Sequence, residues 1–165
     1  MNIGLIMKLL HVFAAFWFIT GVVARDLTFW RAAKVSTVQE VSALLQASDF
    51  FERWGVIRGG FLVLLFGLLT VWLQRWPLFG FLQGASTNWL LLSFILYVGG
   101  SAVIAPLRLI PRRQQRAQAL EEALAKGSIT PELSAALNDK VVNTFRKVEL
   151  VMMVVIVFLM EVKPF

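Results

Sequence analysis

The chain contains no cysteine and only one histidine, His11, among its 165 residues. Without cysteine, disulfide bonds, thiolate metal sites and thiol nucleophiles are excluded. With a single histidine, a haem iron cannot receive two histidine ligands from the same chain. Charged residues are also scarce, at 16% of the chain against 58% hydrophobic residues, a balance too apolar for an ordinary soluble domain of this size.

The sequence motifs of familiar enzymes are missing as well. It has no glycine-rich phosphate loop, no serine, histidine and aspartate set, and no carboxylate cluster at metal-ligand spacing. These absences argue against an independent hydrolase or nucleotide enzyme and favour a protein without catalysis of its own. The net charge of +6 comes from basic residues beside apolar runs, where anionic lipid headgroups attract them, so nucleic acid is not an expected partner.

Four apolar runs carry nearly all of the hydrophobicity: Ile3–Ala24, Gly55–Leu73, Trp89–Ala105 and Val148–Val162. Their lengths are comparable to the ~20 residues that a helix needs to cross ~30 Å of hydrocarbon. Because lipid offers the backbone no hydrogen-bond partners, each run is predicted to be a helix. The sequence therefore predicts an all-α fold: a four-helix transmembrane bundle, forming a single domain over residues 1–165, with short amphipathic helices in the cytoplasmic connections.

The positions of lysine and arginine predict how the bundle is oriented. Connections 25–54 and 106–147 hold ten of these residues in addition to Arg146 and Lys147, which enter the last span, whereas the connection between the second and third runs and the C-terminal tail hold two. Because basic residues are retained in the cytoplasm, those two connections are expected inside the cell and both termini outside. The ten are Arg25, Arg31, Lys34, Arg53, Arg108, Arg112, Arg113, Arg116, Lys126 and Lys140, and the two are Arg75 and Lys163.

Both cytoplasmic connections contain helix signals. Residues 36–40, Ser-Thr-Val-Gln-Glu, form a capping box before an apolar stripe, which predicts a short amphipathic helix, and Asp49 is expected to cap the second span. In the other connection, a helix over Arg112–Lys126 is predicted to stop at Gly127, and Thr130 and Pro131 are expected to begin another. This helical hairpin is either a platform for a partner or a solvated linker.

Ionisable side chains within the apolar runs are candidates for function, because placing a charge there costs about 3 kcal/mol. At ~1.5 Å per residue, Arg58 and Glu149 fall near the cytoplasmic face and are expected to pair. Lys8 and Glu161 fall near the outer face, where they either pair or extend towards water. Both sets act either as structural clamps between helices or in handling a substrate or proton.

His11 lies one helical turn after Lys8 in the first run. An imidazole can ligate haem iron or another transition metal, carry a proton near neutral pH, or donate a hydrogen bond between helices. If it binds haem, a second ligand would come from Lys8, from Met7, Met152 or Met153, or from a partner subunit. Trp17 is expected to pack inside the bundle. The glycines at 59, 60, 67, 99 and 100 are expected to allow close helix packing.

Several segments resemble the DUF2269 family of predicted bacterial integral membrane proteins. They are residues 8–15 (KLLHVFAA), 76–80 (WPLFG), 88–91 (NWLL), 130–133 (TPEL) and 159–165 (LMEVKPF). The resemblance implies a multi-pass protein of the bacterial inner membrane. The first run also resembles, more distantly, the opening helix of copper-resistance D-like proteins and of HemJ-type protoporphyrinogen oxidases. That second resemblance implies haem b bound at His11.

Three functions follow from these observations. The first is a haem-associated redox membrane protein with His11 as ligand and with Lys8 or Arg58 near the propionates. The second is a non-enzymatic accessory subunit of a larger respiratory or photosynthetic membrane complex. The third is a small transporter or channel that uses the buried charges, with a homo-oligomer supplying the missing walls. In all three the lipid bilayer is the immediate partner.

Overall fold

The computed structural model describes residues 3–164, and within 101–108 it describes the backbone alone. All regular structure in this part of the chain is helical, as predicted. The elements are α1 (Ile3–Ala32), α2 (Val38–Phe51), η1 (Glu52–Arg58), α3 (Gly59–Leu73), η2 (Gly80–Gln83), α4 (Trp89–Ile95), η3 (Leu96–Ile104), α5 (Ala105–Lys126), α6 (Pro131–Leu137) and α7 (Lys140–Val162). Some of these helices join end to end into long rods. Helix α2 continues through the π-helix η1 into α3, and α4 continues through the π-helix η3 into α5.

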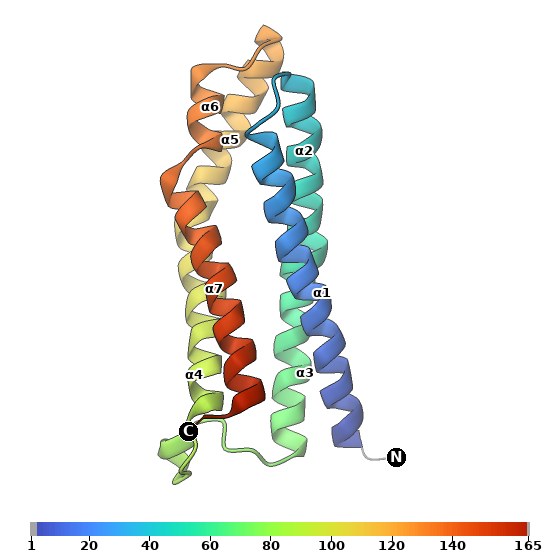
Figure 1. Ribbon diagram of the computed structural model, residues 1–165, viewed down its shortest axis with the longest axis vertical. Coiled ribbons are helices and arrows are strands. Elements are labelled where there is room, and N and C mark those ends of the chain that lie inside the picture. The colour runs from blue at the N-terminus through green and yellow to red at the C-terminus, as the bar shows by residue number, and fades with distance from the viewer. Residues whose placement is uncertain (1–2, 165) are drawn as a thin grey trace.

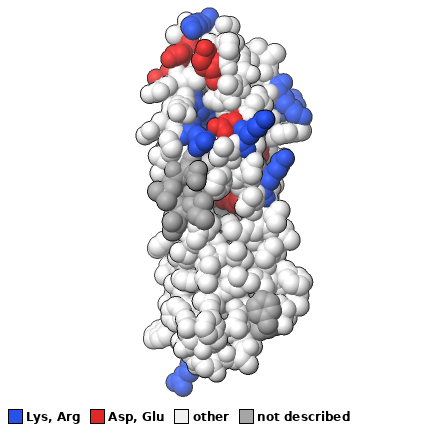
Figure 2. All heavy atoms as spheres, turned by 90° about the vertical axis from the view of Figure 1, so that its left-hand side faces the viewer, with Lys and Arg blue, Asp and Glu red and all other residues white. Residues whose placement is uncertain are grey.

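The rods run side by side along the length of the molecule (Figure 1). They form two pairs: α1 packs along α2, η1 and α3, while α7 packs along α4, η3 and α5. Both termini lie at one end, and α6 lies at the other (Figure 1). Figure 2 shows that, on the face drawn, charged side chains gather over the half that carries α6 and are almost missing from the other half. We call these halves the charged end and the apolar end.

Within the part of the chain that the structure describes, two helices are long and apolar enough to cross a membrane: α1, and the continuous helix Val38–Leu73. The third predicted span begins in a shorter apolar helix, Trp89–Gly100, and continues into residues whose side chains are not described. The fourth, Val148–Val162, forms the second part of α7. Its fifteen residues extend over about 22 Å, less than the ~30 Å of a typical hydrocarbon core.

Helix α1 extends to Ala32, past the end of the apolar run at Ala24. The buried residues of the helix show why. They follow a spacing of three and four residues that continues without interruption past Ala24, so the same face of the helix stays in contact with its neighbours. Those residues are Ala14, Phe18, Gly21, Arg25, Phe29 and Ala32. Trp17 lies off this stripe and is 47% exposed, contrary to its predicted place inside the bundle.

The charged end contains a small apolar core. Phe29 and Ala32 of α1 meet Val38, Val41 and Leu45 of α2 there, together with residues of α5 and α6. Val38, Val41 and Leu45 belong to the predicted amphipathic helix, which therefore packs on the bundle. The residues from α5 and α6 are Ala119, Ala123, Leu133 and Leu137.

Local signals located the helix ends at the charged end correctly. The Thr37 hydroxyl accepts a hydrogen bond from the Glu40 amide at 3.3 Å, and Thr130 accepts one from the Leu133 amide at the same distance. Helix α5 stops at Lys126, and Gly127 follows with φ at +69°. Asp49 is not a cap, because α2 continues without a break into η1 and leaves no helix start at that point.

Candidate functional site

A buried ion-pair network at the charged end has Arg25 of α1 at its centre. Its guanidinium donates to the carboxylates of Asp26 at 2.9 Å, Glu52 at 3.0 Å and Glu149 at 2.6 Å. Because only 5% of the Arg25 side chain is exposed, these carboxylates replace the water that a guanidinium would otherwise bind. One side chain thus joins α1 to η1 and to α7.

Two further arginines complete this network. Arg113 of α5 pairs with Glu52, and Arg146 of α7 donates to Asp26 at 2.5 Å. The three arginines and three carboxylates balance in charge, which buried ions require if the cost of removing them from water is to be offset. All four rods of the bundle contribute at least one of these six side chains.

Two more ion pairs flank the network. Arg116 pairs with Asp49 at 3.3 Å, and Arg112 pairs with Asp139 at 3.0 Å. The ring of Phe29 lies close to two of the arginines, with the Arg146 guanidinium carbon 3.9 Å and that of Arg116 5.2 Å from the ring centroid. Cations are attracted to the face of an aromatic ring, so Phe29 helps to hold both side chains.

The pKa values of Arg116 and Arg146 are both lowered. Burial is the main cause for each, and repulsion adds to it, from Arg113 on Arg116 and from Arg25 on Arg146. The pKa of Arg146 falls to about 10, so this guanidinium is still charged at neutral pH. The lowered pKa values therefore reflect mainly the removal of these two guanidinium groups from water.

His11 lies in the apolar end, between α1 and α3. Its Nδ1 donates to the Val63 carbonyl oxygen at 2.9 Å, and the ring packs on Gly67, where a Cβ would lie 3.1 Å from the imidazole Cε1. A carbonyl oxygen only accepts, so Nδ1 carries the proton and Nε2 of the neutral ring keeps a lone pair. The imidazole therefore joins two helices through one nitrogen and retains a ligand atom on the other.

Lys8 lies one turn before His11 on the same helix. Lys8 is exposed. Among the residues that the structure describes, no group of three or more histidine, aspartate or glutamate side chains is arranged to hold a metal ion.

The other predicted site residues, Arg58, Glu149 and Glu161, do not lie together in the structure. Glu149 enters the network, but its partner is Arg25 and not Arg58, so the expected Arg58–Glu149 pair is wrong. Arg58 is exposed, and its guanidinium stacks 3.6 Å from the Trp54 ring centroid. It precedes Gly59, which faces α1, and is therefore rotated by about 100° away from that interface. Glu161 is also exposed, so of the three charges expected to be buried only Glu149 is.

Sequence reasoning missed Arg25, Asp26 and Glu52, which were assigned to a connection. A usable signal was present, because Arg25 continues the buried spacing of Phe18 and Gly21. The closest approach of α1 to η1 was missed too: a Cβ on Gly55 would collide with the Cα of Gly21.

Glycines 59, 60, 67 and 100 do lie against neighbouring helices, as expected, whereas Gly99 faces open space. One hydrogen bond joins the two helix pairs within the apolar end. The Tyr97 hydroxyl donates to the Gly60 carbonyl oxygen at 2.7 Å, and the Tyr97 ring meets Phe18 edge to face.

Comparison with protein families decides the broad assignment. The DUF2269 profile, described as a predicted integral membrane protein, matches residues 5–164. The chain belongs to the DUF2269 family. Membership, together with two helices that are long and apolar enough to cross a bilayer, makes it an integral membrane protein in contact with lipid.

Wider comparisons add no relative to this family assignment. No curated protein and no solved structure matches the chain significantly. The more distant resemblance to copper-resistance D-like and HemJ-type proteins is not shown.

Proposed function

We propose that this DUF2269 member is a four-span protein of the bacterial inner membrane that serves as a non-enzymatic accessory subunit of a larger membrane complex. The observation that carries the proposal is the balanced ion-pair network, which ties the charged end to all four rods. The basic residues of the chain are concentrated at the charged end. The charged end therefore lies in the cytoplasm, and both termini lie outside.

The depth of the network supports this placement. The 22 residues from Ile3 to Ala24 of α1 rise about 33 Å, close to the ~30 Å of the hydrocarbon core. Arg25 then lies at the cytoplasmic boundary of the membrane, where a charge is less costly than at the bilayer centre. Glu149, which binds Arg25, places the start of the apolar part of α7 at the same level.

The arrangement gives the protein a rigid cytoplasmic platform. On the membrane side of the platform, ion pairs fix the rods relative to one another. Within the platform, residues of α2, α5 and α6 pack into the apolar core of the charged end. A platform held in one position relative to the membrane suits the docking of a partner, since less conformational freedom is lost on binding.

Co-purification tests the accessory role. We expect wild-type protein, extracted in a gentle detergent, to retain a companion chain at fixed stoichiometry in native mass spectrometry. Glu52→Gln weakens the network and should reduce that retention, whereas Glu132→Gln, the same change at an exposed site, should leave it unchanged. Wild-type protein that is a solitary monomer under these conditions would contradict the proposal.

A second candidate function is haem association through His11, favoured by the Nε2 lone pair that the Val63 hydrogen bond leaves available. His11 would be the one axial ligand from this chain, and a second would come from another subunit. Haem would supply electron transfer when bound, and Gly67 would leave room for the imidazole. We expect a Soret band in protein from haem-supplied cells that is lost in His11→Ala and kept in Lys8→Ala. A colourless wild-type preparation would exclude this role.

A further inference from the structure

The charged end contains a small cavity that the proposed accessory role does not use. Its volume is about 20 Å³, and it lies between α1, α5 and α7. Five of the ten lining residues are arginines and one is a carboxylate. The lining consists of Arg25, Phe29, Leu109, Arg112, Arg113, Arg116, Ala136, Val142, Arg146 and Glu149.

We propose that this arginine-lined cavity binds a phosphate group, presented either by an anionic lipid headgroup or by a free phosphate. Most of the carboxylates that pair with these arginines are not part of the cavity lining. Asp26, Glu52, Asp49 and Asp139 all lie outside the lining, and Glu149 alone faces it. Of the five carboxylates that pair with these arginines, four are therefore absent from the lining.

The arginines retain hydrogen-bond donors for such a ligand. In the ion pairs between described residues, Arg113, Arg116 and Arg146 each use a single guanidinium nitrogen. A guanidinium carries five N–H donors in a planar fork that matches the oxygens of a phosphate. The pKa values of Arg116 and Arg146 are lowered first by burial and then by repulsion from neighbouring arginines, and a nearby anion would offset that repulsion.

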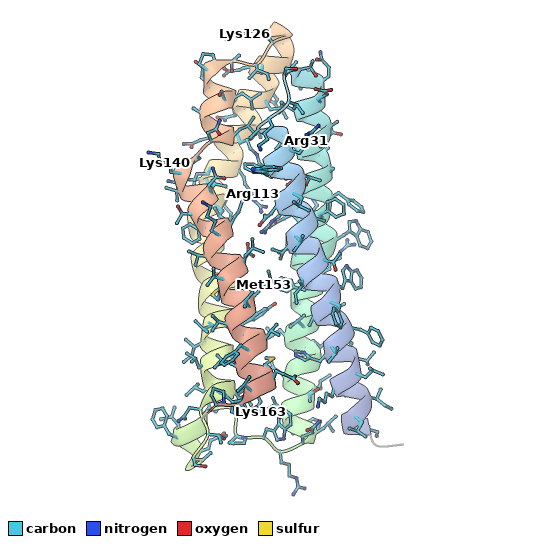
Figure 3. All side chains as sticks on the ribbon, viewed as in Figure 1. Arg31, Arg113, Lys126, Lys140, Met153 and Lys163 are labelled. Carbon is cyan, nitrogen blue, oxygen red and sulfur yellow. The ribbon has the colours of Figure 1, made fainter. Side chains whose placement is uncertain are left out.

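The size of the cavity defines how the ligand would sit. About 20 Å³ accepts a water molecule or a single phosphate oxygen, but not a whole phosphate. Arg25 is the most buried of the lining arginines, with 5% of its side chain exposed, while Arg112 and Arg113 are 29% and 39% exposed. One oxygen would enter, and the others would stay at the mouth within reach of the more exposed arginines. Figure 3 shows Arg113 at the charged end, far from Lys163 at the apolar end.

The lipid source rests on the proposed topology, and the free-phosphate source does not. If Arg25 lies at the cytoplasmic boundary, the cavity is level with the headgroups of the inner leaflet, where basic pockets between helices bind anionic lipids. A wrong topology would remove the lipid argument and leave the cavity chemistry intact.

Two measurements on full-length protein distinguish the sources. In nanodiscs of mixed phosphatidylglycerol and phosphatidylcholine, native mass spectrometry reports which lipid stays bound. In detergent, thermal unfolding is followed with inorganic phosphate and with chloride at equal ionic strength.

A lipid ligand predicts about tenfold preferential retention of phosphatidylglycerol. A free-phosphate ligand predicts a rise in melting temperature with phosphate and equal retention of both lipids. Absence of both effects in the wild type overturns the proposal, and this comparison needs no variant.

Matched variants test whether the cavity is responsible. Arg116→Gln removes one lining arginine, and its partner Asp49 is already 48% exposed, so the fold should tolerate the change. We expect Arg116→Gln to reduce the preferential retention of phosphatidylglycerol, or the rise in melting temperature with phosphate, about tenfold. Arg31→Gln makes the same charge change on an exposed side chain outside the cavity and should leave the effect unchanged. Equal losses in the two variants would assign the effect to general surface charge and overturn the site.

Discussion

Helix packing at the charged end and helix packing at the apolar end are stabilised by different interactions. At the charged end, a core of buried apolar residues and a network of ion pairs stabilise the packing, as in a soluble protein. In the apolar end, glycines permit close backbone contact, and side chains such as His11 and Tyr97 donate to helix carbonyls. Buried ion pairs thus link the helices at the charged end, whereas close backbone contacts and single hydrogen bonds to carbonyl oxygens link them at the apolar end.

The largest expected effect follows from removing Arg25. Arg25→Leu leaves Glu52 and Glu149 without their central partner in a buried site, so we expect a loss of about 3–5 kcal/mol in the free energy of unfolding. Denaturant unfolding in mild detergent, followed by circular dichroism, measures the loss. Arg31→Leu, at an exposed position of the same helix, should change stability by less than about 0.5 kcal/mol. Similar values for the two variants would contradict the central role of Arg25.

The next largest effect concerns helix packing towards the apolar end. Gly55→Ala places a methyl group against the Cα of Gly21, and overpacking of this kind costs roughly 1–3 kcal/mol. Gly99→Ala is the matched control, because among the described residues no atom of another helix lies within 4 Å of the added Cβ. The same unfolding assay compares the two. The packing account fails if Gly99→Ala is at least as destabilising as Gly55→Ala.

A smaller effect is expected at the start of α6. Thr130→Ala removes the hydroxyl that accepts from the Leu133 amide, and loss of such a cap typically costs about 1 kcal/mol. Thr144→Ala makes the same change at an exposed position within α7 and should be close to neutral. Amide hydrogen exchange in α6 should rise in the first variant alone. Unchanged exchange there would show that α6 does not depend on its cap.

The smallest effect is expected where the helix pairs meet in the apolar end. Tyr97→Phe keeps the ring against Phe18 and removes the hydrogen bond to Gly60. Hydrogen bonds between helices in a membrane contribute about 0.6 kcal/mol on average, so the loss should be of that size. A loss as large as that of Arg25→Leu would show that the apolar end depends on polar contacts as strongly as the charged end.

The parts that were predicted correctly are those set by nearby residues. The caps at Thr37 and Thr130 and the stop at Gly127 depend on three or four neighbouring positions, and the structure confirms all three. Helix content also follows from the long apolar runs.

The parts that were predicted wrongly depend on the direction in which a side chain points. Depth alone could not show that Arg58 faces away from the bundle, or that Glu149 binds an arginine 124 positions earlier in the sequence. Arg25 was assigned to a connection because it ends an apolar run. The spacing of buried residues along α1 would have placed it correctly.

The orientation of the charged end can be measured directly, because the chain has no native cysteine. Single cysteines at two exposed positions, Gln118→Cys in α5 and Gln83→Cys in η2, report on opposite ends of the molecule. In intact spheroplasts, a membrane-impermeant maleimide should label position 83 at once and position 118 only after the cells are opened. Labelling of position 118 in intact spheroplasts, with position 83 protected, would contradict the proposed topology and the accessory role built on it.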